Sequence, residues 1–116
     1  MRDDRERLFH ILEAMERIEQ RTAPGRDTFD QDELVQVWVV HHLQIIGEAS
    51  RGLSSIFRQE HSDIPWAQII AMRNILVHDY FGIDVEEVWG AVEHDLPELK
   101  HRIEAILQTM PDPGTT

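Results

Sequence analysis

The apolar residues of this chain recur every three to four positions from its first segment to near its last. This spacing places them on one face of a helix, whereas a half-buried strand needs alternating apolar and polar residues. No window alternates in that way for long enough to form a strand. The apolar face of the first segment predicts a helix of about 18 residues; its members are Leu8, Ile11, Leu12, Met15 and Ile18. We therefore predict an all-α fold, a bundle of four or five helices.

Helix start and stop signals divide the rest of the pattern. Residues 22–29 include a Pro and a Gly and are expected to form a loop. A second helix is expected to open at the Asp capping box of residues 30–33. If it continues to about Arg58, it is roughly 42 Å long at about 1.5 Å per residue. Gly47 and Gly52 lie within this segment and argue against an unbroken helix.

Three further helices are expected toward the C-terminus. A cap and a first-turn Pro in residues 62–65 open a helix that we expect to run from Trp66 to about Tyr80. The Gly two residues later is expected to end it. Asp capping boxes at residues 84–87 and 95–98 are expected to open the fourth and fifth helices.

Length and composition indicate a single domain. The 116 residues, 41% of them apolar, suffice for one compact core, which we place in residues 1–110. Residues 111–116 hold two Pro and one Gly and are expected to be disordered. The charged N-terminus lacks the apolar stretch of a signal peptide, and the longest apolar run, residues 37–46, is too short and too polar to span a bilayer. We expect a cytoplasmic protein that does not enter a membrane.

The chain carries a net charge of −11 at pH 7, unevenly distributed. Residues 41–82 hold three Arg against four acids, whereas residues 83–116 hold two bases against eight acids. This acidity disfavours a protein that holds nucleic acid by bulk electrostatics, but it leaves room for a local cleft where a few Arg meet phosphate. It also suits a basic protein partner, although solubility alone accounts for most surface acids. The absence of Cys excludes disulfides, iron–sulfur clusters and thiol nucleophiles.

Side chains capable of chemistry are concentrated at the end of the third expected helix, in residues 72–80. Asn74 and His78 are four apart and share a helix face, so the amide could orient the imidazole. Arg73 and Tyr80 are seven apart and share another face. Arg73 and His78 are five apart, about 140° around an ideal helix. The long Arg side chain, or a loosened last turn, would bring both to one ligand.

Arg together with His suits phosphodiester chemistry. The guanidinium binds two phosphate oxygens and stabilises charge as it develops, while the imidazole transfers protons near neutral pH. Cleaving RNA through its own 2′-OH needs a base for that hydroxyl and an acid for the leaving 5′ oxygen, which one His can hardly supply together. A two-fold dimer would bring two copies of Arg73 and His78 into one cleft, so this chemistry favours a homodimer. The same spacings also describe an ordinary surface pair on a helix.

This stretch and several flanking segments closely resemble the HepT-like family of HEPN-domain proteins. The segments that carry the resemblance are IIGEA (45–49), DIPW (63–66), RNILVHDYFGID (73–84), VW (88–89) and DLPEL (95–99). The resemblance covers nearly the whole chain, from the first helix to about Leu107. Its most specific part is the pattern Arg-x4-His-x-Tyr within these flanks.

The resemblance implies an up-down HEPN-type bundle that dimerises to form a composite cleft. It also implies the toxin of a type VII-like toxin–antitoxin system, a metal-independent endoribonuclease that needs no cofactor. By that similarity Arg73 and His78 are the catalytic pair and Asn74 is the polar residue after the Arg. The implied partner is an MntA-like minimal nucleotidyltransferase antitoxin, which silences the toxin by transferring AMP from ATP to the motif tyrosine, here Tyr80. A bulky anion on Tyr80 would repel an incoming phosphate.

Three further polar residues, Glu48, His41 and His42, lie outside the motif. Glu48 either supports Arg73 or His78 from a neighbouring helix or is a solvated acid. His41 and His42 are adjacent, hence about 100° apart on a helix, and cannot readily chelate one ion. No metal-ligand pattern is present in the sequence, so we expect no metal site.

The remaining expectations concern the tryptophans, the substrate and the alternative functions. Trp38, Trp66 and Trp89 are expected to be core or dimer-interface anchors rather than platforms for base stacking. The cations of the central third are the arginines at positions 51, 58 and 73, so the RNA substrate range should be narrow and cleavage should weaken steeply with salt. One alternative is a non-catalytic HEPN module that binds a nucleotidyltransferase. Another is an acidic helical protein with a purely structural role.

Overall fold

The computed structural model describes residues 2–77 and 84–110, and every regular element in these ranges is helical. The elements are α1 (Arg2–Thr22), α2 (Arg26–Gln31), α3 (Glu33–Arg51), α4 (Ser55–Glu60), α5 (Trp66–Val77), α6 (Val85–Gly90), a π-helical turn η1 (Ala91–Asp95) and α7 (Leu96–Thr109). The predicted all-α class is confirmed. The helices are more divided than the predicted four or five. Dimerisation and the single domain over residues 1–110 stay predictions.

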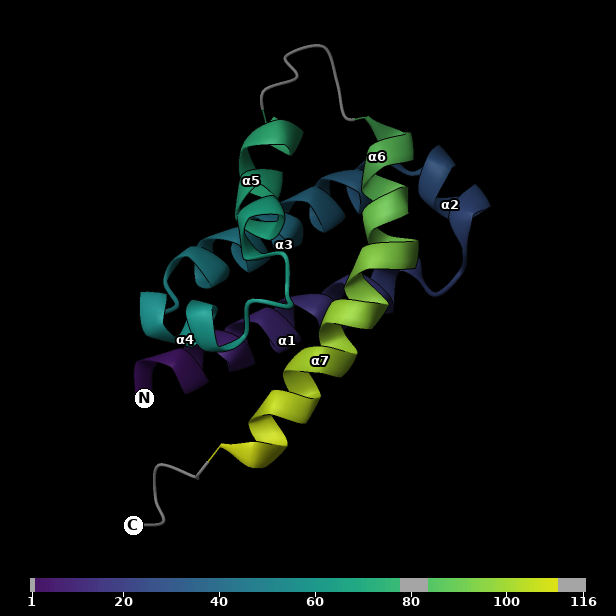
Figure 1. The fold of residues 1–116 in the computed structure, drawn as a ribbon. Coiled ribbons are helices and arrows are strands. Elements are labelled where there is room, and N and C mark those ends of the chain that lie inside the picture. The colour runs from purple at the N-terminus through teal and green to yellow at the C-terminus, as the bar shows by residue number, and fades with distance from the viewer. Residues whose placement is uncertain (1, 78–83, 111–116) are drawn as a thin grey trace.

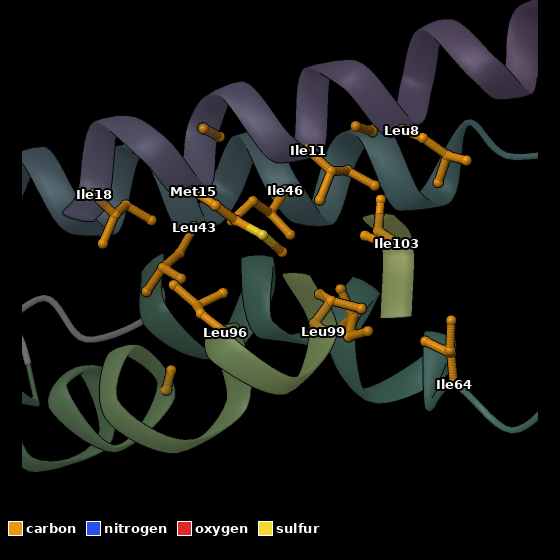
Figure 2. Packing of buried hydrophobic residues seen from close by; sticks show 14 of the residues in the cluster. Leu8, Ile11, Met15, Ile18, Leu43, Ile46, Ile64, Leu96, Leu99 and Ile103 are labelled. Atoms are coloured by element: carbon orange, nitrogen blue, oxygen red, sulfur yellow. The ribbon is translucent and has the colours of Figure 1, made fainter. Parts of the chain in front are cut away.

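The core forms where α1, α3 and α7 meet. Helices α1 and α3 lie side by side, and the continuous rod of α6, η1 and α7 crosses them (Figure 1). In Figure 2 the apolar side chains of α1 face Leu43 and Ile46 of α3 and Leu96, Leu99 and Ile103 of α7. The predicted members of the α1 face are buried or packed against the core. Each fully buried aliphatic side chain contributes about 1.5–3 kcal/mol relative to exposure.

The segment after α1 departs from the predicted loop. Helix α2 occupies residues 26–31 and holds Phe29 in the core, with its ring centroid 5.2 Å from that of Trp89. The residue before α2, Gly25, has a φ of 105°, which a side chain would strain. The cap of α3 is Asp32 rather than Asp30, since the Asp32 carboxylate accepts the backbone N–H groups of residues 34 and 35.

Helix α3 ends at Arg51, so the second predicted helix does not continue to Arg58, and the interruption expected from its glycines occurs at Gly52. The Gly52 backbone N–H closes the helix by donating to the carbonyls of residues 48 and 49. A Cβ at Gly52 would lie 2.7 Å from Arg7 Nε, so the glycine lets the Arg7 guanidinium lie over this helix end. Ser54 then caps α4, with its hydroxyl accepting the Phe57 N–H at 3.1 Å. Gly47, by contrast, is buried within an unbroken helix.

Helix α5 begins at Trp66, as predicted, directly after a proline. Trp66 is buried, and its indole N–H donates to the His61 carbonyl at 3.0 Å. The predicted end near Tyr80 and the predicted stop at Gly82 lie outside the described residues, as do the expected disordered residues 111–116.

The last two predicted helices form one continuous helical rod (Figure 1). Asp84 caps α6 as predicted, accepting the Glu87 N–H at 3.1 Å. Helix α7 begins at Leu96, where the fifth helix was expected, but Asp95 has helical backbone angles and makes no side-chain cap, so the predicted capping box is wrong. Pro97 lacks an N–H, and its ring would clash with the carbonyl four residues back in a regular α-helix. The wider turn of η1 precedes Pro97 and relieves this clash without ending the helix.

Among the described residues, two ion pairs join helices that are distant in sequence. Lys100 of α7 donates to both carboxylate oxygens of Glu19 on α1, at 3.0 and 3.1 Å. Arg26 of α2 pairs with Glu86 of α6. Each hydrogen bond favours the charged cation and so raises its pKa above the usual value. Within the described residues, no helix is both long enough and apolar enough to cross a membrane.

Candidate functional site

The predicted catalytic stretch begins in the last turns of α5. Arg73 and Asn74 lie in this helix, whose bounds are Trp66–Val77, and the structure describes their backbone but not their side chains. His78 and Tyr80 lie outside the described residues. The prediction that Arg73 and Asn74 are helical is therefore confirmed. The grouping of the four side chains stays a prediction.

Glu48 lies on a helix that packs directly against α5. It is in the last turns of α3, and α3 and α5 are in extensive contact. Helices α5 and α6 rise to the same end of the molecule, so the chain on either side of residues 78–83 lies beyond the α1–α3 pair (Figure 1). The structure thus brings the helix of Glu48 alongside the helix of Arg73.

Glu48 also lines a groove of about 320 Å³ between α1 and α3. The polar side chains around it are those of Arg7, His10, His41 and Gln44, above a floor of Ile45 and Ala49. Arg7, His10 and His41 are exposed. The groove therefore places two imidazoles and a guanidinium around one carboxylate.

Arg7 lines the groove with Glu48, which the sequence did not predict. The cations expected near phosphate were arginines of the central third, whereas Arg7 belongs to the first helix. Its proximity to Glu48 arises only when α1 packs along α3, which no spacing in the sequence reports. The one local signal was that Arg7 and His10 are three apart and so share a helix face.

His41 and His42 have different environments. His42 is buried, and its Nδ1 lies 2.7 Å from the Trp38 carbonyl oxygen. His41 is exposed and meets the His42 ring edge-on at a centroid distance of 5.1 Å. Within residues 2–77 and 84–110, no three His, Asp or Glu side chains are grouped so that they could hold a metal ion.

Two of the three tryptophans have the predicted core role, since Trp66 is buried in the core and Trp89 packs against it, whereas Trp38 is half-buried outside that cluster. Trp38 lies 4.5 Å from the His42 ring and donates its N–H to the Arg17 carbonyl. Trp89 packs on Phe29, and Trp66 is the most deeply buried of the three. Their predicted part in a dimer interface stays a prediction.

Comparison with known proteins identifies the family. The family described as "Ribonuclease HepT-like" matches residues 11–106. A Thermococcus cleftensis protein named "Probable ribonuclease HepT" is 39% identical over 106 residues, which cover 90% of this chain and 96% of that protein. "Putative RNase MJ1380" of Methanocaldococcus jannaschii is 35% identical over 106 residues, 90% of this chain and 97% of that protein.

A third relative is longer than this chain. "Gamma-glutamylcyclotransferase and putative RNase MJ0434" of Methanocaldococcus jannaschii is 38% identical over 104 residues, which cover 89% of this chain but only 47% of that protein. The chain thus spans about half the length of this relative. No solved structure matches the chain significantly. The family match covers most of the chain, and relatives of similar length align with nearly all of it. The chain belongs to the HepT-like ribonuclease family.

Proposed function

We propose that this chain is a metal-independent endoribonuclease, the toxin of a type VII-like toxin–antitoxin system that acts in the cytoplasm. The observation that carries the proposal is the family match over residues 11–106, which includes the complete pattern Arg73-x4-His78-x-Tyr80. The names of the relatives refer to RNases and so support RNA as the substrate. One HEPN-like domain over residues 1–110 carries this activity.

The proposed reaction is cleavage of RNA through its own 2′-OH. One His78 takes the proton of the 2′-OH, and the 2′ oxygen attacks the adjacent phosphorus. The P–O5′ bond breaks, and the second His78 of a two-fold dimer donates a proton to the leaving 5′ oxygen. Arg73 binds the phosphate oxygens and stabilises the charge that develops on them. The products are a 2′,3′-cyclic phosphate and a free 5′-OH.

Two other groups position the substrate or the catalytic pair. Asn74 precedes His78 by one helical turn, which suits an amide that orients the imidazole. Glu48 lies on the helix packed against α5 and acts as a positioning residue for Arg73 or His78. Arg7, exposed in the groove beside Glu48, adds a cation that meets an RNA phosphate near the cleft.

Silencing is proposed to act through Tyr80. In this reaction the Tyr80 phenolic oxygen attacks the α-phosphorus of ATP, pyrophosphate leaves and the phenolic proton is released. An MntA-like minimal nucleotidyltransferase antitoxin supplies the catalysis, and ATP is its substrate rather than a cofactor of this chain. The AMP group adds negative charge seven residues from Arg73, where it repels the phosphate of an incoming RNA.

The alternative is a non-catalytic HEPN module that binds a nucleotidyltransferase. The net charge of −11 favours it, because RNA phosphates are repelled by an acidic surface. The intact Arg73 and His78 favour the nuclease.

The two functions are distinguished by RNA cleavage with chain expressed without any partner and with chelator present. Intact mass on the same batch excludes a preparation that already carries AMP. We expect the wild type to cut RNA, and expect Arg73→Ala and His78→Ala variants of unchanged circular dichroism to lose at least about 100-fold in rate. No cutting by folded, unmodified dimer would support the binding module. Cutting that survives both substitutions would indicate a contaminating nuclease.

A further inference from the structure

A second groove lies between the start of α5 and the α6–α7 rod, and it shares no described lining residue with the groove at Glu48. It has a volume of about 310 Å³. Its floor is apolar and belongs to the buried core, with contributions from Ile64, Ile69, Ala91, Leu96 and Leu99. Figure 2 shows Leu96 and Leu99 near each other at the edge of that core, with Ile64 farther along it. The floor therefore offers aliphatic surface to any side chain that enters.

Four carboxylates surround this apolar floor. They belong to Asp63, Glu87, Asp95 and Glu98, and all four residues are exposed. Among the described residues of the lining, the one cation is Arg102, and it is already paired with two of these carboxylates, at 2.6 Å from Asp63 and 3.1 Å from Glu98. Within the part of the chain that the structure describes, Glu87 and Asp95 form no ion pair. The rim thus keeps a negative charge that its own cation does not balance.

The π-helical turn shapes one wall of the groove. Ala91 and Asp95 are the first and last residues of η1, and both line the groove. A π-turn contains more residues than an α-turn and widens the helix here, and residues four apart still share one face as they do in an α-helix. The small Ala91 leaves the floor open while Asp95 stands at the rim.

We propose that this groove docks a cationic amphipathic segment of a partner protein. Aliphatic side chains of the segment cover the apolar floor, and its flanking Lys or Arg side chains pair with Glu87 and Asp95. A second copy of this chain fits poorly, because its net charge is −11 and its C-terminal third is the most acidic part. The proposal does not depend on RNA cleavage, since none of the described residues that line the groove is a predicted catalytic residue.

The test uses a fluorescent 16-residue helical peptide made of two eight-residue repeats. Each repeat has Leu at positions one, four, five and eight and Lys at the other positions. We expect saturable binding by fluorescence anisotropy that weakens as NaCl rises from 50 to 300 mM, because salt screens the rim charges. Glu87→Lys combined with Asp95→Lys should weaken binding about tenfold or more, since two attractions become repulsions. A peptide with the same composition but scrambled order should bind at least about fivefold more weakly.

The matched control combines Glu6→Lys with Glu104→Lys. Both residues are exposed, neither lines the groove, and the change in net charge is the same. This control should change the dissociation constant less than about threefold. Equal weakening by the two double variants, or equal binding of the scrambled peptide, would reduce the effect to net charge and overturn the proposal. A change of oligomeric state in the groove variant alone, seen by light scattering, would make a second copy the occupant and also overturn it.

Discussion

Asp4 shows how a single buried carboxylate can join two helices. The side chain is almost fully buried at the start of α1. One carboxylate oxygen accepts the Ser54 backbone N–H at 2.8 Å, and the other accepts the Ser54 hydroxyl hydrogen at 2.7 Å. The same hydroxyl oxygen accepts the Phe57 N–H and so caps α4. Helix α1 therefore orders the N-terminus of α4 through one residue.

Replacing Asp4 with Ala should lower the free energy of unfolding by about 2 kcal/mol, because the Ser54 N–H loses its partner in a buried site and the cap is weakened. The measurement is urea unfolding followed by circular dichroism. Asp3→Ala is the matched control, since Asp3 is exposed in the same helical turn, and it should cost less than about 0.5 kcal/mol. Equal losses in the two variants would assign the effect to the helix dipole rather than to the buried hydrogen bonds.

At the scale of elements, the sequence predicted helices better than their ends. Three local signals predicted helices that are present in the structure. They are the periodic apolar face of α1, the cap at Asp84 before α6 and the proline directly before Trp66. The end of α3 depends on Gly52 and the guanidinium of Arg7, which come together only through packing. The capping box predicted at Asp95 is absent because a π-turn accommodates Pro97 within a continuing helix. The local sequence is compatible both with a capped helix start at Asp95 and with a helix that continues through it.

The same distinction holds for the candidate site. The motif of Arg73 and His78 is contained in one short stretch, so the sequence alone reveals it. The residues around Glu48 are not contained in one stretch of sequence, because Arg7 and His41 come from two helices that meet only in the folded chain. Sequence therefore predicts the chemical groups, while the packing of α1, α3 and α5 determines what surrounds them.

The ion pair between Lys100 and Glu19 predicts a dependence of stability on pH. Its hydrogen bond raises the pKa of Lys100 above the unfolded value, so the stabilisation is complete below about pH 10.4 and is lost as the pH rises through the folded pKa. Lys100→Met should therefore lower the free energy of unfolding by about 0.5 kcal/mol at pH 7 and by less at pH 11.5, measured by urea unfolding.

Arg17→Met is the control for that titration. Arg17 forms a surface pair with Glu13 within α1, and a guanidinium keeps its charge throughout this pH range. The small loss of unfolding free energy in Arg17→Met should be the same at both pH values. A Lys100→Met cost that stays constant up to pH 11.5 would contradict the ion pair as the source of the stabilisation.

At the scale of the whole molecule, the proposed chemistry requires more than one chain. A chain of 13.6 kDa holds one His78, and RNA cleavage through the 2′-OH needs both a base and an acid. Light scattering at micromolar concentration should therefore give at least twice the chain mass. A monomer that cuts RNA at full rate would contradict the two-histidine mechanism.

Mixed dimers test that mechanism directly. Wild-type and His78→Ala chains, unfolded together in equal amounts and refolded, should pair at random, so that about one quarter of the dimers carry two His78 side chains. If both are needed, cleavage per mole of total chain falls to about one quarter of the wild-type value, whereas independent sites would retain about one half. Wild-type chain refolded alone controls for losses in refolding. Because a variant chain then removes activity from its wild-type partner, a result near one quarter would assign the acid and the base to different chains, and a result near one half would assign both to the same chain.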